Sequence, residues 1–237
     1  MTIHIHPTTE LAPRALLPGD PGRALLLAQL LTTAPKMFNH NRGLWGYTGI
    51  AADGEPLTIQ STGMGGPSAA IVLEELCELG LTHAIRVGTC GALAAGLELG
   101  QLVVAEAALA RDGTSRALGA GDRVAADAGL VAALRAAAGI EARVGAIATS
   151  DLFYDFQPAR ARAWAREGAL AVEMEAAALL RVGELRGVAV GCVLAVTDVF
   201  DAAGVRSRLD ADGLVAAGER AGRAGAAALA AAAGVSP

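Results

Sequence analysis

One arginine interrupts an otherwise apolar segment of the chain, over residues 82–87. Arg86 stands directly before the turn Gly88-Thr89-Cys90-Gly91. Burying an unpaired guanidinium costs free energy, so Arg86 needs either a carboxylate in a structural ion pair or a bound oxyanion. The turn offers backbone N–H groups and the hydroxyl of Thr89, a combination that cradles phosphate in proteins. A phosphate group is therefore one candidate partner of Arg86, and a carboxylate is the other.

A second arginine follows a predicted helix start. Asp20 is a favoured N-cap residue and Pro21 is favoured at the first helical position, so Arg23 lies in the first turn. A cation there opposes the helix dipole, whereas the free N–H groups of the same turn attract anions. An anion bound between these groups and Arg23 would explain the arrangement. The alternative is an ordinary capped helix with a solvated arginine.

Two acidic residues, Glu173 and Glu175, stand two positions apart beside a short apolar segment. They share a face if the backbone is extended, and they point in different directions on a helix. A carboxylate accepts paired hydrogen bonds, which suits the vicinal hydroxyls of a sugar. Acids are also common at helix N-termini, where the dipole favours them, so that interpretation stays open.

A further acid, Asp198, follows nine uncharged residues over 188–196. An uncharged run of this length is typical of a strand buried on both faces. An aspartate at the end of such a strand is a candidate general acid or base, because burial tunes its proton affinity. Asp198 as a simple turn or helix cap is the competing interpretation.

Three other features are weaker. The Gly-rich turn over 61–68 permits close backbone approach to a ligand, with Met64 as an apolar surface, but fits neither the dinucleotide-binding nor the Walker pattern. It is equally consistent with a plain tight turn. Arg42, in a polar turn over 39–46, and His4, near the N-terminus, are expected to be solvated on their local sequence alone.

The elements that position these residues alternate between strands and helices. Strands are predicted over 57–61, 82–87, 102–107, 142–149, 170–172 and 188–196, and helices over 68–79, 127–138, 158–167, 174–182 and 211–233. This alternation predicts an α/β fold on a largely parallel or mixed sheet. In such folds ligands bind beyond the carboxyl ends of the strands, where Arg86, Glu173 and Asp198 are expected.

The composition indicates one compact domain over residues 1–237. Hydrophobic residues make up 53% and charged residues 18%, which excludes disorder and a collagen-like repeat. Charged residues or glycine interrupt each apolar stretch before about 18 strongly apolar residues accumulate, so we expect no membrane association. A net charge of −5 argues against nucleic-acid binding. Three widely spaced cysteines and a start without signal-peptide features favour a reducing cytoplasm and no metal site.

Seven motifs occur together in an order that is specific for one family. They are Leu-Pro-Gly-Asp-Pro-Gly-Arg at 17–23, Asn-Arg-Gly-Leu-Trp-Gly at 41–46, Thr-Gly-Met-Gly-Gly-Pro-Ser at 62–68, Arg-Val-Gly-Thr-Cys-Gly at 86–91, Ser-Asp-Leu-Phe-Tyr at 150–154, Glu-Met-Glu-Ala-Ala at 173–177 and Thr-Asp at 197–198. On these motifs the chain resembles the bacterial hexameric type of nucleoside phosphorylase, which includes purine nucleoside and uridine phosphorylases. The resemblance runs from about residue 16 to residue 198.

The resemblance implies a single α/β domain with a central mixed β-sheet flanked by helices. It implies phosphorolysis of the N-glycosidic bond, in which inorganic phosphate is a co-substrate and the products are a free base and (deoxy)ribose 1-phosphate. No other cofactor and no metal are expected. The ligands are a nucleoside and phosphate, and the expected assembly is a homohexamer built as a trimer of dimers.

The resemblance also assigns roles to individual residues. The phosphate-binding residues are expected to be Gly19, Arg23, Arg86 and Thr89, joined by Arg42 from a neighbouring subunit. The nucleoside-binding residues are expected to be His4 from the adjacent protomer, Met64, Cys90, Gly91, Phe153, Val172, Glu173, Met174 and Glu175. Asp198 is expected to protonate the purine at N7 with the help of a downstream arginine. Arg206 and Arg208 both depart from the family's spacing, and we assign this role to Arg208.

Three alternatives remain at this stage. Uridine phosphorylases read uracil through a glutamine and an arginine after the Phe-Tyr motif, and Gln157 and Arg160 follow Phe153-Tyr154 here without the longer insertion. Asp198 and Cys90 favour the purine branch. A hydrolytic nucleosidase of the same fold would leave the arginines unexplained. A non-catalytic nucleoside-binding protein would be expected to lose Asp198 or the arginines.

Overall fold

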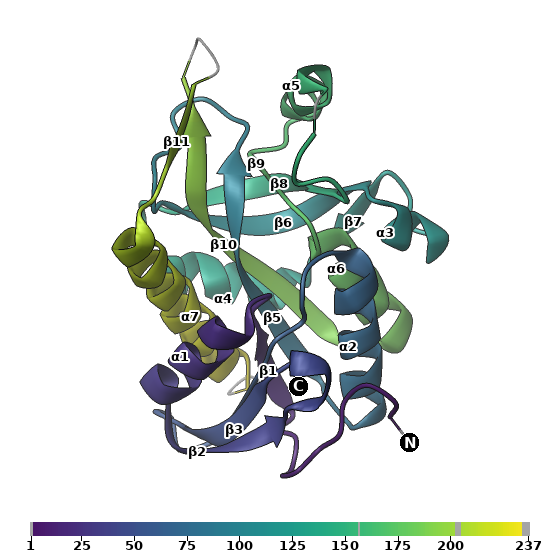
Figure 1. Cartoon of the computed structure of the whole chain (residues 1–237), viewed down its shortest axis with the longest axis vertical. Coiled ribbons are helices and arrows are strands. Elements are labelled where there is room, and N and C mark those ends of the chain that lie inside the picture. Colours follow the sequence, from purple (N-terminus) through teal and green to yellow (C-terminus); the bar gives the residue numbers. More distant parts are fainter. Residues whose placement is uncertain (1, 156, 202–204, 234–237) are drawn as a thin grey trace.

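The computed structural model of the chain describes residues 2–155, 157–201 and 205–233, which form a mixed β-sheet with helices on both sides (Figure 1). The strands are β1 (Arg14–Leu17), β2 (Thr32–Asn39), β3 (Gly46–Ala51), β4 (Pro56–Gln60), β5 (His83–Ala92), β6 (Leu102–Arg111), β7 (Arg123–Ala125), β8 (Arg143–Ser150), β9 (Ala171–Glu173), β10 (Ala189–Phe200) and β11 (Arg206–Arg208). The helices are α1 (Pro21–Leu31), α2 (Gly66–Glu78), α3 (Gly113–Ala117), α4 (Ala128–Ala138), α5 (Pro158–Arg166), α6 (Ala176–Arg186) and α7 (Ala211–Ala233), with a short 3-10 turn, η1 (Asn41–Gly43).

The sheet closes on itself in one part and stays open in the other. The strand order is β11-β10-β6-β8-β9-β5-β1-β4-β3-β2, with β7 beside β6, and β10 also pairs with β5. Because of that extra pairing, β5, β9, β8, β6 and β10 form a ring. Strands β1, β4, β3 and β2 extend from β5 as an open sheet. The parallel pairs β1–β5 and β5–β10 align three carboxyl ends.

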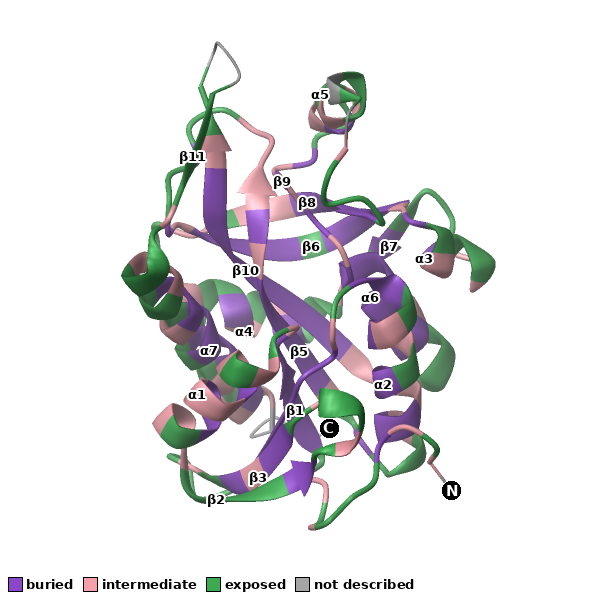
Figure 2. Ribbon diagram, viewed as in Figure 1, coloured by how far each residue is buried: buried purple, intermediate pink, exposed green. Residues whose placement is uncertain are grey.

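Two apolar layers cover the sheet. Helices α2 and α6 pack on one side, where Leu73 and Leu179 belong to a single buried cluster. Helices α1, α4 and α7 pack on the other side, where Leu27 and Leu134 are fully buried. The central strands are accordingly buried along most of their length, whereas the outer helix faces are exposed (Figure 2). The strands are thus a fixed platform for residues at their ends.

The predicted α/β architecture is confirmed, and each predicted helix and strand is present. The turn predicted over 88–91 is wrong, because β5 continues to Ala92 and residues 88–91 pair with β10 inside the sheet. Asp20 caps α1 by accepting from the Arg23 N–H, and Asp127 caps α4 in the same way. Sequence patterning missed the hairpin β2–β3. Strand β2 lies at the sheet edge, is mostly exposed and contains Pro35, so it lacks the alternation of a half-buried strand.

The segment 170–182 needs one correction. The helix predicted to begin at residue 174 begins at Ala176, because β9 continues to Glu173 and Glu175 occupies the N-cap position. The two acids therefore flank a strand-to-helix turn and lie neither on one strand nor on one helix. In the part of the chain that the structure describes, no helix is long and apolar enough to cross a membrane.

Candidate functional site

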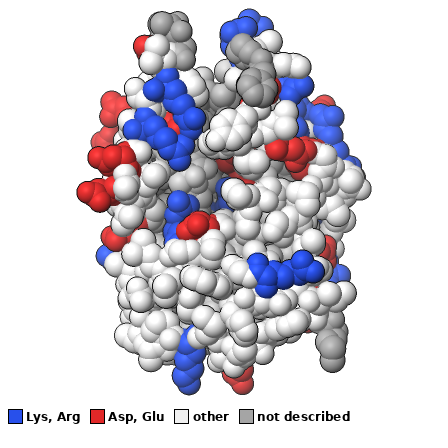
Figure 3. All heavy atoms as spheres, viewed as in Figure 1, with Lys and Arg blue, Asp and Glu red and all other residues white. Residues whose placement is uncertain are grey.

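A cavity of about 470 Å³ opens at the carboxyl ends of β1, β5 and β10. Fourteen sequence-predicted site residues line it: Gly19, Arg23, Met64, Arg86, Thr89, Cys90, Gly91, Phe153, Val172, Glu173, Met174, Glu175, Asp198 and Arg208. In the space-filling view the hollow lies between the two upper projections of the molecule, with basic side chains on the β11 side (Figure 3). The sheet register brings these residues together, since Leu17 and Cys192 both pair with Arg86, and Asp198 pairs with Gly91.

Arg86 is the most buried cation of the cavity, with a side chain only 4% exposed. Its Nε donates to Glu173 at 2.8 Å, and its Nη2 lies 2.5 Å from a Glu175 oxygen. Burial alone would lower the pKa of Arg86, but the carboxylates of Glu175 and Glu173 outweigh burial and raise it. Its Nη1 is buried without a hydrogen-bond partner among the described residues. The structure thus contains the ion pair and still leaves one donor for a ligand.

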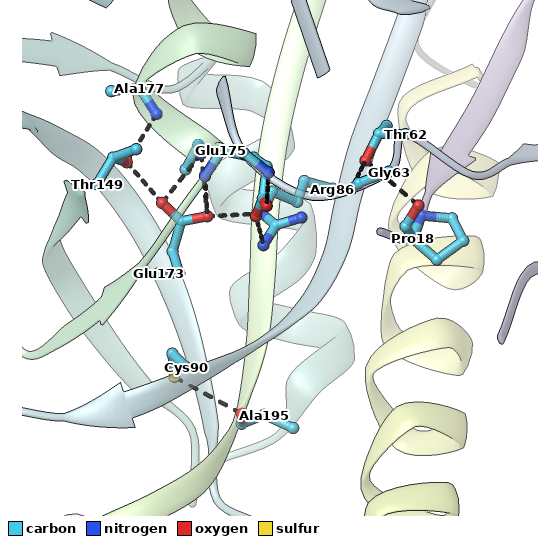
Figure 4. A network of polar contacts seen from close by, with 12 residues as sticks. Pro18, Thr62, Gly63, Arg86, Cys90, Thr149, Glu173, Glu175, Ala177 and Ala195 are labelled. Carbon is cyan, nitrogen blue, oxygen red and sulfur yellow. Dashed lines mark hydrogen bonds and ion pairs between the residues drawn. The ribbon is translucent and has the colours of Figure 1, made fainter. Parts of the chain in front are cut away.

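Glu173 is saturated by protein donors, as Figure 4 shows. Besides Arg86, it accepts from the Thr149 hydroxyl at 2.5 Å, from the Glu175 N–H at 2.9 Å and from the Ala176 N–H at 3.0 Å. Its side chain has no exposed surface. Both acids line the cavity, but Glu173 is used in holding the guanidinium of Arg86, so Glu175 is the one of the two that remains a candidate acceptor for a diol.

Glu175 connects α6 to the Gly-rich turn. Its Oε1 accepts from the Gly65 N–H at 2.6 Å, and Gly65 has a positive φ of 85° that favours glycine. Burial is the largest influence on Glu175 and raises its pKa, with Glu173 acting in the same direction and Arg86 against it. A carboxylate that is desolvated in this way gains from further hydrogen-bond donors, such as the hydroxyls of a ligand.

Gly88 is required by its contact with Arg86. A Cβ at this position would lie 2.8 Å from Arg86 Nη2 and 3.0 Å from Leu194 Cδ2. A side chain here would therefore displace the guanidinium. Gly88, which lies within β5, thus has a steric role beside Arg86.

Arg23 places a second guanidinium in the same cavity. Burial lowers its pKa, the charge of Arg86 also lowers it, and Asp20 opposes both. Within the described part of the chain, the Arg23 guanidinium has no ion-pair partner. Two guanidinium groups that repel each other across one cavity are suited to an anion bound between them.

At the other end of the cavity, Asp198 is held by two arginines. Arg208 lies directly opposite it in the β10–β11 ladder, with Nη1 3.0 Å from Oδ1. Arg206, two residues earlier on the same face of β11, places Nε 2.7 Å from Oδ1. Thr197 donates to Oδ2 at 2.8 Å. The hairpin explains how arginines at this spacing reach Asp198. The sequence offered Arg206 and Arg208 as candidates and the role was assigned to Arg208 alone, whereas both contact Asp198.

Arg206 also contacts an aromatic side chain of the cavity. Its guanidinium carbon lies 5.5 Å from the ring centroid of Phe153, within the range of a cation–π interaction. The alternation Arg206-Ser207-Arg208 was a usable signal, because residues two apart on a strand share a face.

His4 and Arg42 do not line the cavity. The imidazole Nδ1 of His4 lies 2.6 Å from Glu75, and the Asn41 amide donates to the His4 carbonyl at 2.9 Å. Arg42 is exposed, with a φ of 57°. These contacts join the N-terminal segment to the turn that carries Arg42. The expectation that both serve a neighbouring subunit stays a prediction.

Thr149 links this network to α6 and gives a test of it. Its hydroxyl accepts from the Ala177 N–H and donates to Glu173. Thr149→Val should raise the phosphate KM about tenfold while kcat falls less, because an unsatisfied buried acceptor costs about 1–3 kcal/mol and lets Arg86 move. Thr149→Ser keeps the hydroxyl and should restore the KM in the same phosphate titration. A valine variant with reduced thermal stability and an unaltered KM would contradict this role.

Among the residues that the structure describes, no group of three or more histidine, cysteine, aspartate or glutamate side chains is arranged to hold a metal ion. The polar groups of the cavity are instead guanidinium, carboxylate, hydroxyl and backbone N–H groups. They offer charge-assisted hydrogen bonds to an anion at one end, hydrogen-bond acceptors at Glu175 and a charged pair beside an aromatic ring at the other end.

Comparisons with known proteins identify a family for this architecture. The family model described as the phosphorylase superfamily matches residues 13–233. A purine nucleoside phosphorylase DeoD-type from Caldanaerobacter subterraneus subsp. tengcongensis is 37% identical over 205 residues, covering 84% of this chain and 88% of that protein. The protein of the same name from Geobacillus kaustophilus is 38% identical, covering 84% and 86%.

Two solved structures with the same fold are of a uridine phosphorylase. A crystal structure of uridine phosphorylase from Vibrio fischeri ES114 superposes with a TM-score of 0.85 at 27% identity, covering 98% of each chain. A second structure of that enzyme, complexed with 6-hydroxy-1-naphthoic acid, has a TM-score of 0.83 at 28% identity, covering 93% of this chain and 92% of the other.

Proposed function

The chain belongs to the phosphorylase superfamily, and we propose that it is a purine nucleoside phosphorylase. The enzyme is a pentosyltransferase that cleaves purine (deoxy)ribonucleosides with phosphate to the free base and (deoxy)ribose 1-phosphate. The observation that carries this proposal is the buried, unpartnered Nη1 of Arg86, beside Arg23 and Thr89 in one cavity. A water nucleophile would not require these cationic donors, whereas a phosphate anion is bound and oriented by them.

The cavity divides into three parts in this proposal. Phosphate lies between Arg23 and Arg86, close to Gly19 and Thr89. Glu175 accepts from the ribose hydroxyls. The base lies against Phe153. The residues that complete the sugar and base parts are Met64, Met174, Cys90, Gly91 and Val172, and all of them line the cavity.

Cleavage requires the base to leave as phosphate approaches the anomeric carbon. The transition state resembles an oxocarbenium ion, as in other glycosyl transfers. In this step Asp198 acts in its protonated form: its carboxyl proton passes to purine N7 as the C–N bond breaks, which makes the base a better leaving group and leaves Asp198 as a carboxylate. Arg206 and Arg208 then stabilise the aspartate carboxylate that remains, with contacts of 2.7 and 3.0 Å.

A neighbouring subunit supplies the remaining cation in this proposal. Within one chain the cavity lining also contains four carboxylates, of which Asp20, Glu173 and Glu175 lie at the end that holds Arg23 and Arg86, so a phosphate dianion there needs more positive charge. Arg42 is exposed and does not line the cavity of its own protomer. The N-terminal segment that carries His4 is hydrogen-bonded to the turn that carries Arg42. We therefore extend the proposal to a homo-oligomer, with the family's hexamer as the expected form.

A purine substrate is favoured over a pyrimidine by the residues after Phe153. Gln157 is exposed at the start of α5, and Arg160 pairs with Asp155, so neither residue lines the cavity. The two residues that would read uracil are therefore directed elsewhere, which supports the purine assignment of the sequence relatives.

Three further expectations belong to this proposal. The whole chain, residues 1–237, is treated as one phosphorylase domain. The reaction uses phosphate as co-substrate and needs no cofactor. The cysteines Cys77, Cys90 and Cys192 are free thiols, which is typical of a reducing cytoplasm.

The proposal is tested by base release from nucleosides with and without phosphate. Purified protein should release base from purine nucleosides only when phosphate is present, because the arginines bind the nucleophile. Equal release without phosphate would identify a hydrolase. Turnover of uridine alone would identify the pyrimidine branch, and binding without turnover would identify a nucleoside-binding protein.

A further inference from the structure

Gly218 lies inside α7, well away from either end of the helix. A glycine in a helix interior is less favourable than alanine, because it loses more conformational freedom on folding. The φ of Gly218 is not in the left-handed region, so any residue could adopt the backbone conformation at this position. The reason for a glycine here must therefore lie in what its missing side chain would contact.

The missing side chain would meet Arg23. A Cβ at Gly218 would lie 3.2 Å from Nε, 3.4 Å from Cδ and 3.9 Å from Cγ of Arg23, and these are the three nearest heavy atoms outside its own turn of the helix. A contact of 3.2 Å is tighter than nine in ten that Cβ atoms make, so a methyl group here would displace Arg23 by a few tenths of an ångström. The side chain of Arg23 thus packs directly on the bare backbone of α7.

One turn further along α7, Gly222 has a different neighbour. Figure 1 shows α1 and α7 side by side, and on α1 Leu27 follows Arg23 by one turn as Gly222 follows Gly218. A Cβ at Gly222 would collide with Cδ2 of the fully buried Leu27. Gly222 therefore accommodates a side chain of the apolar core, whereas Gly218 accommodates a cation of the cavity.

Arg23 depends on this packing because few polar contacts hold its guanidinium. Asp20 accepts from the backbone N–H of Arg23 at 2.7 Å, but within the described part of the chain the guanidinium has no ion-pair partner. The apolar stem of an arginine packs on neighbouring surface and thereby places the charged end. The contact with α7 therefore determines where the Arg23 guanidinium lies in the cavity that it shares with Arg86.

From these contacts we propose that Gly218 is a positioning residue for phosphate: its lack of a side chain lets Arg23 lie where it binds the same anion as Arg86. The inference rests on the proposed phosphorylase activity and adds a residue to the phosphate end of that site. Gly218 does not line the cavity, so it acts through Arg23. The signature of this role is weaker phosphate binding in a helix whose intrinsic propensity has improved.

Gly218→Ala should raise the phosphate KM about fivefold to tenfold at saturating inosine, because a charge-assisted contact with the anion is partly lost. The inosine KM at saturating phosphate should change less than about twofold, since the interaction lost is one with phosphate. Titration calorimetry with inorganic phosphate alone should show the same weakening, independently of turnover. An unchanged phosphate KM together with an unchanged phosphate Kd would overturn the inference.

A double substitution tests whether Gly218 acts through Arg23. Arg23→Ala removes the three atoms that the new Cβ would approach, so adding Gly218→Ala to it should leave the phosphate KM unchanged. In that background the added alanine should raise the melting temperature by about 2–4 °C, because its helix propensity is no longer offset by a close contact. A further rise of the phosphate KM, equal to that caused by Gly218→Ala alone, would contradict action through Arg23.

Gly222→Ala is the matched control on the same face of α7. It should lower the melting temperature through the collision with Leu27, while the phosphate KM stays within about twofold of the wild-type value. Equal rises of the phosphate KM in Gly218→Ala and Gly222→Ala would overturn the specific role of Gly218. A wild-type protein that cleaves no purine nucleoside with phosphate would instead overturn the proposed function, and the phosphate calorimetry would then decide on Gly218 by itself.

Discussion

Arg86→Gln should lower kcat/KM for phosphorolysis at least about a hundredfold, the loss expected when one preorganised donor to a developing or transferring anion is removed. The phosphate KM should rise far more than the nucleoside KM, because Nη1 of Arg86 is a buried donor with no hydrogen-bond partner among the described residues. Initial rates over a phosphate titration at fixed inosine measure both effects. Unchanged phosphate dependence would remove Arg86 from the phosphate site.

This substitution also affects folding, so it needs a control of the same kind. Removing Arg86 leaves Glu173 and Glu175 as buried carboxylates without their cation, and breaking a buried pair costs about 3–5 kcal/mol. Arg14 is a second buried arginine, paired with Asp53 far from the cavity lining. Arg14→Gln should lower the melting temperature with an unchanged phosphate KM, which separates lost stability from lost ligand binding.

Asp198→Asn is the second prediction with a large effect. The amide cannot deliver a proton to N7, and general acid catalysis contributes roughly 10²–10⁴ in rate, so kcat for inosine should fall by that order. A nucleoside methylated at N7 already carries the positive charge that protonation creates. Its cleavage should change little in this variant, as measured by base release under saturating phosphate.

The contrast between the two substrates is what identifies the acid. Asp127→Asn is a suitable control, because asparagine caps the start of α4 as well as aspartate does and the site lies outside the cavity lining. Equal losses for inosine and the N7-methylated nucleoside would show that Asp198 acts through structure and not by proton donation. Unchanged inosine turnover would remove it from catalysis altogether.

Much of the fold could be predicted from the sequence, because the burial pattern and the local cap and turn residues indicate the same helices and strands. The Asp20-Pro21 start of α1, the capped helix α4 and the uncharged run in β10 each combine composition with a turn or cap signal. The β2–β3 hairpin lacked such agreement, since an edge strand that is largely exposed carries no burial pattern. Strand β11 has only three residues, and its position depends on pairing with β10.

The candidate site likewise contains residues that the sequence could predict and residues that it could not. Arg86 and Arg23 were identifiable because each cation stands where the local structure disfavours it. The different roles of Glu173 and Glu175 were not readable, because they depend on Thr149, which comes from β8 and pairs with β9 only in the folded sheet. The contact of Arg206 with Asp198 could not be assigned for a similar reason: the two residues become neighbours only through the β10–β11 ladder.

The central claim is that phosphate is the nucleophile held by Arg23 and Arg86. Phosphorus-31 NMR of purified protein with inosine and inorganic phosphate tests it most directly, because the signal reports the fate of the phosphate itself. The account predicts that inorganic phosphate is converted to a pentose 1-phosphate ester in a one-to-one ratio with released hypoxanthine. Hypoxanthine release with free ribose and an unchanged inorganic phosphate signal would contradict it.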